Sequence, residues 1–82
     1  MLNREYLLQR IVVDPRVLAG KPTIRGLRIS VEQILAALTA GVPMADLFQD
    51  YPELEAADIQ AALAYALERV SEERVYALAA VA

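Results

Sequence analysis

Four positively charged side chains, a type that binds anionic groups, stand close together in the first third of the sequence. They are Arg16, Lys21, Arg25 and Arg28, and no aspartate or glutamate occurs between residues 15 and 31. Guanidinium and ammonium groups form charge-assisted hydrogen bonds with phosphate and carboxylate oxygens. We therefore predict that these four residues bind an acidic pocket of another protein or the phosphates of a nucleic acid.

Charge is divided unevenly along the chain. Residues 1–30 carry six Lys/Arg and two acids, a net charge of +4, whereas residues 31–82 carry two Arg and nine acids, a net charge of −7. A basic patch on an acidic body is expected, so the total of −3 does not exclude nucleic acid as a partner. The alternative, which the sequence leaves open, is that the cations cap helix carbonyls or pair with acids of the second half.

The sequence gives little support for a catalytic, metal or nucleotide site. The chain has no histidine and no cysteine, so it lacks the usual neutral-pH base, thiol nucleophile and soft metal ligands. The segment 20–23 reads G-K-P-T, without the preceding glycine and following Ser/Thr of a phosphate-binding loop. Asp46, Asp50 and Glu53 are interpreted as a solvated acidic face. We expect a binding protein without enzymatic activity, metal or cofactor.

The length limits the organisation of the chain. Eighty-two residues are expected to form a single domain over 1–82, since a chain of this size buries only about 60% of its unfolded surface. The first residues lack the apolar run of a signal peptide, and no apolar stretch approaches the ~20 residues that span a bilayer. A cytoplasmic location without membrane contact is the expectation.

The candidate site is expected to lie on a small β element. Residues 10–14 read R-I-V-V-D, a β-branched run that Pro15 closes, which predicts a short strand. Residues 19–28 read A-G-K-P-T-I-R-G-L-R, where glycine and proline predict two turns around a short extended piece.

Helical periodicity follows. Ser30 is a suitable N-cap for a helix that Gly41 ends, and its apolar stripe comprises Val31, Ile34, Leu35 and Leu38. A second, short helix is predicted from Pro43 to Tyr51, with Met44, Leu47 and Phe48 at helical spacing. A third begins at Glu55 or Ala56, and its continuous apolar face comprises Ile59, Ala62, Leu63, Ala66, Leu67 and Val70.

Two interpretations of these helices are open. The Gly41-Val42-Pro43 connection predicts a helix-turn-helix-related domain, mainly α, with three to four helices and a short N-terminal β element, homeodomain-like or winged-helix-like. The alternative is an ordinary three-helix bundle. The second helix exposes Asp46, Gln49 and Asp50, so it is poorly suited to reading a DNA groove.

The C-terminal segment 71–82 begins with S-E-E-R and continues as V-Y-A-L-A-A-V-A. Either the third helix continues through it or a fourth begins. An exposed uncharged segment promotes association, so we expect Tyr76, Leu78 and Val81 to lie in a homodimer or partner interface. The alternative is that they cover the core of their own subunit.

Several motifs in fixed order resemble one known family. Residues 20–31 read G-K-P-T-I-R-G-L-R-I-S-V, similar to the G-K-P-x-I-x-G-T-R-I-P-V segment of the domain-of-unknown-function family 433. R-I-V-V-D-P at 10–15, G-V-P at 41–43, D-Y-P-E-L at 50–54 and D-I-Q-A-A-L-A-Y-A at 58–66 extend the resemblance over about residues 8–70. Leu27 and Ser30 depart from the threonine and proline usual in the family, so a contact of the threonine hydroxyl would be missing.

The resemblance implies a helix-turn-helix-related fold and a role as antitoxin of a bacterial toxin–antitoxin pair with a PIN-like nuclease toxin. Such nucleases hold a metal with clustered carboxylates, so the four cations are expected to occupy the position of the metal or of the substrate phosphate. Operator DNA binding by a homodimer is a further expectation. Alternatives are a stand-alone DNA-binding transcriptional regulator and a structural or adaptor oligomerisation module without a toxin.

Overall fold

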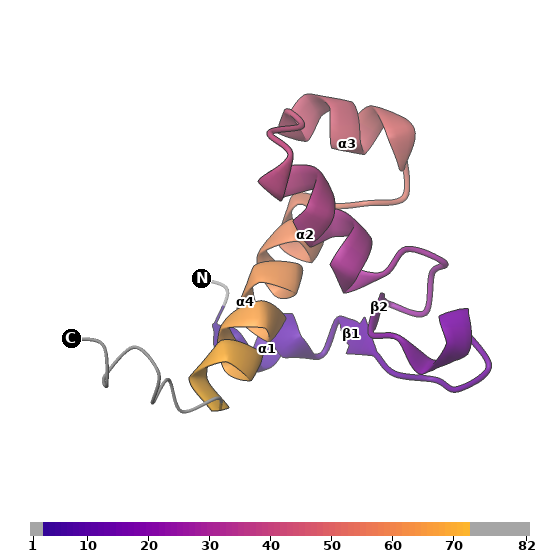
Figure 1. Cartoon of the computed structure of the whole chain (residues 1–82), viewed down its shortest axis with the longest axis vertical. Coiled ribbons are helices and arrows are strands. Elements are labelled where there is room, and N and C mark those ends of the chain that lie inside the picture. The colour runs from indigo at the N-terminus through magenta and orange to yellow at the C-terminus, as the bar shows by residue number, and fades with distance from the viewer. Residues whose placement is uncertain (1–2, 73–82) are drawn as a thin grey trace.

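The computed structural model describes residues 3–72 and is mainly helical with a small β element (Figure 1). Four α-helices and one 3-10 turn accompany two short strands in this part of the chain. Their order is α1 (Arg4–Leu8), β1 (Ile11–Val12), the 3-10 turn Leu18–Gly20, β2 (Thr23–Ile24), α2 (Val31–Thr39), α3 (Met44–Asp50) and α4 (Ala56–Glu72). The prediction of a mainly α chain with a short N-terminal β element is confirmed. Tyr76, Leu78 and Val81 lie outside the described residues.

The two strands pair antiparallel in a minimal sheet. Ile11 lies opposite Ile24, and Val12 lies opposite Thr23, whose hydroxyl also donates to the Val12 carbonyl at 3.1 Å. A further bridge joins Thr23 to Ser30. Strand β1 is shorter than the predicted range of residues 10–14, because its partner β2 has only two residues that pair with it.

Helix α2 begins and ends as its sequence predicts. The Ser30 hydroxyl accepts from the Gln33 backbone N–H at 3.0 Å, and the Gln33 side chain accepts from the Ser30 backbone N–H at 2.8 Å. This reciprocal capping box satisfies two backbone donors that the first turn of a helix leaves free. Gly41, with a φ of 82°, follows the helix in the left-handed conformation of a C′ glycine.

Helices α3 and α4 also follow the predicted spacing. Pro43 precedes α3, and Tyr51 follows its last residue. Helix α4 continues without a break through Ser71 to Glu72, so the polar segment that begins at residue 71 does not end it within the described range. No helix in residues 3–72 has the length and apolar character needed to cross a membrane.

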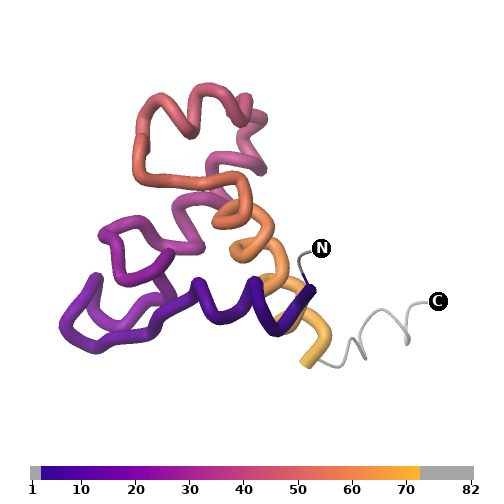
Figure 2. The backbone as a smooth tube through the Cα atoms, turned by 180° about the vertical axis from the view of Figure 1, so that it is seen from behind, coloured from indigo at the N-terminus to yellow at the C-terminus, as the bar shows by residue number. Residues whose placement is uncertain are grey.

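Helix α1 was not expected from the sequence. It has five residues and no buried side chain, which gives it no apolar periodicity to detect. The Asn3 side chain caps it by accepting from the Tyr6 backbone N–H at 2.8 Å, and Arg4 forms a 3.0 Å ion pair with Glu68. Helix α1 lies beside the second half of α4, as both views of the chain show (Figures 1 and 2).

One apolar core joins these elements. Its buried members are Ile24, Ile29, Val31, Ile34, Leu47, Leu54, Ile59 and Ala62. The core therefore takes residues from β2, α2, α3 and the start of α4. Of the apolar face predicted for α4, only Ile59 and Ala62 are buried, whereas the later members remain partly or largely exposed.

Candidate functional site

A tight turn at Arg25 and Gly26 stands at the centre of the predicted basic segment. The Leu27 backbone N–H donates to the Ile24 carbonyl at 2.8 Å, and the two central residues have positive φ values of 51° and 77°. Positive φ at both central positions defines a type I′ turn. Gly26 adopts it freely, whereas a side chain at position 25 is disfavoured by about 1–2 kcal/mol. Something must therefore hold Arg25 in place.

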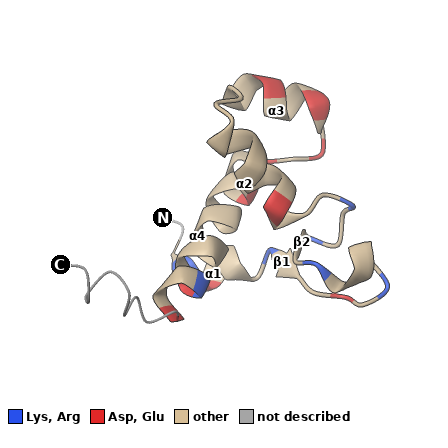
Figure 3. Ribbon diagram, in the orientation of Figure 1, with Lys and Arg blue, Asp and Glu red and all other residues tan. Residues whose placement is uncertain are grey.

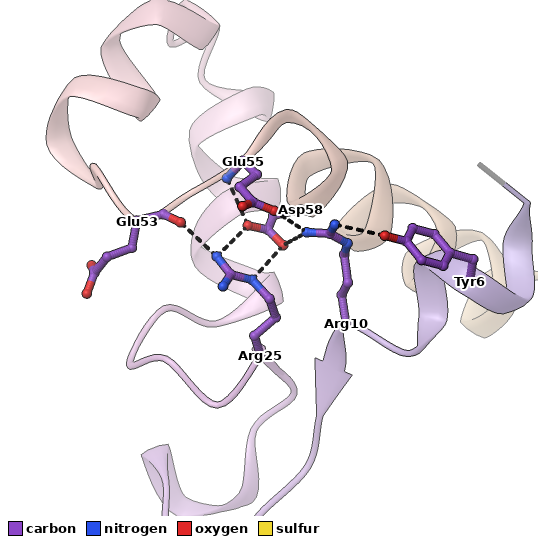
Figure 4. A network of polar contacts seen from close by, with 6 residues as sticks. All are labelled: Tyr6, Arg10, Arg25, Glu53, Glu55 and Asp58. Atoms are coloured by element: carbon purple, nitrogen blue, oxygen red, sulfur yellow. Dashed lines mark hydrogen bonds and ion pairs between the residues drawn. The ribbon is translucent and has the colours of Figure 1, made fainter. Parts of the chain in front are cut away.

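The Arg25 side chain is held by Asp58 on the first turn of α4 (Figure 4). Its Nε donates to Asp58 Oδ1 at 3.1 Å and its Nη2 donates to Asp58 Oδ2 at 2.9 Å, which is a bidentate pair. The same Nη2 donates to the Glu53 carbonyl at 2.7 Å. The turn is thus fixed to the loop before α4 and to α4 itself.

A second arginine completes this network. Arg10 Nη1 donates to Asp58 Oδ1 at 2.9 Å and to Glu55 Oε1 at 2.7 Å. The Asp58 side chain is 0% exposed, and its Oδ2 also accepts from the Glu55 backbone N–H at 2.8 Å. Arg10 Nη2 also donates to the Tyr6 hydroxyl at 3.3 Å, so the network links the middle of α1, the hairpin turn and the start of α4 (Figure 4).

The electrostatics of Asp58 reflect two opposing influences. Burial is the largest single influence and raises the pKa of its carboxyl group, because the charged form loses its hydration. Hydrogen bonds from Arg25, the Glu55 backbone and Arg10 act together in the other direction, and the pKa ends below the ordinary aspartate value. Asp58 is therefore ionised in the folded chain at neutral pH.

For Arg25 the intramolecular alternative raised by the sequence applies. Its guanidinium group pairs with a buried acid of the second half of the chain, and hydrogen bonding to Asp58 raises its pKa. Its role in this structure is to position the turn that precedes Arg28. The Arg25 side chain is 35% exposed, but its guanidinium group is hydrogen-bonded to the buried Asp58 and to the Glu53 carbonyl, which distinguishes it from the other three cations of the predicted site.

The other three cations are more exposed. Arg16 is 89% exposed and pairs with Asp14 through Nε at 3.1 Å and Nη2 at 3.0 Å. Lys21 pairs with Glu32 at 3.0 Å, and both side chains are more than half exposed. Within residues 3–72, Arg28 is exposed and has no hydrogen bond or ion pair through its side chain. Exposed pairs contribute about 0–1 kcal/mol, so they exchange readily for another anion.

We define the basic loop surface as Arg16, Lys21 and Arg28. Lys21 and Arg28 share a shallow hollow of about 430 Å³, whose lining also includes Leu18, Ala19, Ser30 and Gln33. Leu18, Ala19 and Gly20 all have positive φ, so the backbone turns sharply beneath Lys21. Figure 3 shows cations on the loops around β1 and β2, acidic residues among these loops and at the start of α2, and further acids on α3 at the top of the view. Because Asp14 and Glu32 pair with Arg16 and Lys21 at the same surface, the separation of charge in space is partial.

Three residues of the network around the buried Asp58 were not predicted from the sequence. Arg10 was assigned only to a strand, and Glu55 and Asp58 only to the start of a helix. The available signal was the position of Asp58, three residues after Glu55, where an acidic side chain is placed to accept the backbone N–H that precedes the helix. Its arginine partners lie 48 and 33 residues away, which local patterns do not reveal.

Comparison with known proteins gives one match. The model of a family described as "Protein of unknown function (DUF433)" matches residues 11–66, which include β1, the basic loop surface, α2, α3 and most of α4. No curated protein matches the chain. No solved structure matches it either.

Proposed function

We propose, from the premise that this chain belongs to the DUF433 family, that it is an antitoxin-like module that neutralises a PIN-like nuclease through the basic loop surface. The observation that carries the proposal is a set of three exposed cations, Arg16, Lys21 and Arg28, on a chain whose net charge is −3. A carboxylate-lined nuclease site is the kind of partner that such a surface fits.

In the proposed binding step, ion pairs within the chain are replaced by ion pairs with the nuclease. The carboxylates of Asp14 and Glu32 hold Arg16 and Lys21 in the free chain, and both pairs lie at the surface. Anions of a nuclease site replace these weak pairs in an interface from which water is excluded, where charge pairs gain strength. Arg28 enters without giving up a pair among the described residues, so it is expected to contribute most.

Preorganisation supports the same proposal. The turn that precedes Arg28 is fixed by Arg25 to the buried Asp58, and Lys21 follows a sharply turned backbone. A loop that is already ordered loses less conformational entropy on binding than a disordered one. Arg25 and Asp58 therefore act as positioning residues for the basic loop surface.

The direct test is growth rescue by co-expression with a PIN-like nuclease chosen from the genes that adjoin this one. Two variants of equal net charge are compared, each three units below the wild type. The loop-neutral variant carries Arg16→Gln, Lys21→Gln and Arg28→Gln. The charge-matched variant carries Gln9→Glu, Ala45→Glu and Gln49→Glu, all at exposed positions outside the loop.

The wild type and the charge-matched variant are expected to rescue growth and to retain the nuclease in a pull-down. The loop-neutral variant is expected to lose both, with its helix content unchanged by circular dichroism. Rescue by a folded loop-neutral variant at the wild-type level would rule out the basic loop surface as the inhibitory contact.

Operator DNA is a second candidate partner, and the α2–α3 pair favours it. The helices are joined by a short connection with Gly41 in the left-handed conformation, as in a helix-turn-helix-related unit. Because α3 exposes Asp46 and Asp50, we place phosphate contacts on the basic loop surface instead. Binding to a labelled promoter duplex should then weaken with salt, with a log–log slope of about −2.7 for three phosphate contacts. A slope that the loop-neutral variant leaves unchanged would contradict this assignment.

A further inference from the structure

Helix α4 carries an apolar ridge that the described part of the chain, residues 3–72, leaves uncovered. Leu63, Leu67 and Val70 are 49%, 55% and 60% exposed. They occur at spacings of four and three residues, which places them on one face of the helix. We define these three residues as the α4 ridge.

An apolar groove lies directly beside this ridge, between α2 and α4. Its volume is about 460 Å³, and its apolar lining comprises Val31, Leu35, Ala36, Tyr65, Ala66 and Val70. Val70 belongs to both the ridge and the groove wall, so the two features form one continuous surface.

Charge is almost absent from this surface. No charged residue occurs from Ile59 to Leu67, nor from Gln33 to Ala45. The charged residues at the groove rim are Glu32 and Arg69, and each is paired within the chain, to Lys21 and Glu72 respectively. A nucleic acid or a highly charged peptide finds no complementary group here.

We propose that a second copy of this chain covers the surface, with the α4 ridge of each copy seated in the groove of the other. A ridge and a groove side by side on one face are self-complementary about a two-fold axis, which is the requirement for an isologous dimer. Two identical acidic chains repel each other in general, but an uncharged face brings no like charges together. This inference does not depend on the nuclease or on the basic loop surface.

Light scattering on the full-length chain tests the proposal. The wild type is expected to have twice the 9.0 kDa mass of one chain. Leu67→Glu places a charge in the middle of the ridge, and Val70→Glu places one where ridge and groove meet. Both variants are expected to shift to the mass of one chain at the concentration at which the wild type is dimeric.

Met44→Glu is the matched control, because Met44 is 44% exposed on α3, outside the ridge and groove. It should remain dimeric. Circular dichroism establishes that all three variants are folded, which is expected because the replaced side chains are partly exposed.

Each contrary outcome overturns the proposal. A wild-type chain that stays monomeric up to its solubility limit excludes a second copy as the occupant and points to residues 73–82 of the same chain. A dimer that persists in both Leu67→Glu and Val70→Glu assigns self-association to another surface. Neither result bears on nuclease rescue, so the two proposals fail separately.

Discussion

At the residue scale, Asp58 is the fully buried charged side chain of the described structure. The guanidinium groups of Arg10 and Arg25, both from the first third of the chain, compensate its charge. Burying a charge costs several kcal/mol in lost hydration, which a well-formed network offsets. Replacing Asp58 would leave Arg25 without an acidic partner and Arg10 with Glu55 alone, so the effect should exceed that of any surface pair.

We expect Asp58→Asn to lower the free energy of unfolding by about 3–5 kcal/mol, because both arginines would lose their buried counter-charge. Urea denaturation followed by circular dichroism measures the change. Glu53→Gln is the control, since the network uses only the backbone carbonyl of Glu53 and its exposed side chain should matter by less than about 0.5 kcal/mol. Equal midpoints for the two variants would show that the network contributes little.

The lowered pKa of Asp58 also predicts how stability depends on pH. A carboxylate whose pKa is lower in the folded state stabilises the fold above its unfolded pKa, which is about 3.9, and loses that contribution as the pH falls through the folded value. Urea midpoints measured downward from about pH 5 should therefore fall in the wild type. In Asp58→Asn this component of the fall should be missing. Parallel curves for the two proteins would contradict the assignment to Asp58.

At the scale of elements, the sequence was sufficient wherever structure is set by neighbouring residues. Ser30 and Gln33 form the capping box of α2, and Gly41 follows its end, as local spacing indicates. Helix α1 could not be predicted, because it lacks an apolar periodicity and is held by contacts with the distant α4. Dependence on distant contacts also explains why the network at Asp58 was not predicted. Arg25 and Asp58 can be read from the sequence, but their pairing across 33 residues cannot.

The capping box yields a prediction at this scale. Ser30→Ala removes the hydroxyl that accepts from the Gln33 backbone N–H, and we expect it to destabilise the protein by about 1 kcal/mol. Ser71→Ala, at an exposed position in α4, is the comparison and should be neutral or slightly stabilising because alanine favours helix. Thermal unfolding of both variants decides the point. A loss at residue 71 as large as at residue 30 would argue against a specific cap.

At the scale of the whole molecule, charge separation outweighs net charge. The acids of α3 lie apart from the loops, and Asp14 and Glu32 neutralise only Arg16 and Lys21, so Arg28 is expected to leave the local potential around the basic loop surface positive despite the total of −3 (Figure 3). The field extends over about 10 Å at 0.1 M salt, which keeps the two regions distinct for an approaching partner.

Heparin chromatography tests this separation without any cognate partner. The wild type and the charge-matched variant should be retained at low ionic strength and should elute as salt screens the contact. The loop-neutral variant, which has the same net charge as the charge-matched one, should pass through the column. Equal elution of these two variants would show that total charge alone governs the behaviour.

Helix α4 has a consequence for how a paired molecule would engage its targets. Its 17 residues form a rod of about 26 Å, with Asp58 near one end and Val70 near the other. Pairing through the ridge would therefore hold two basic loops in a fixed mutual orientation. The assembly would be bivalent, and a target with two matching sites would meet the second loop at a high effective concentration, so its avidity would exceed the affinity of either loop alone.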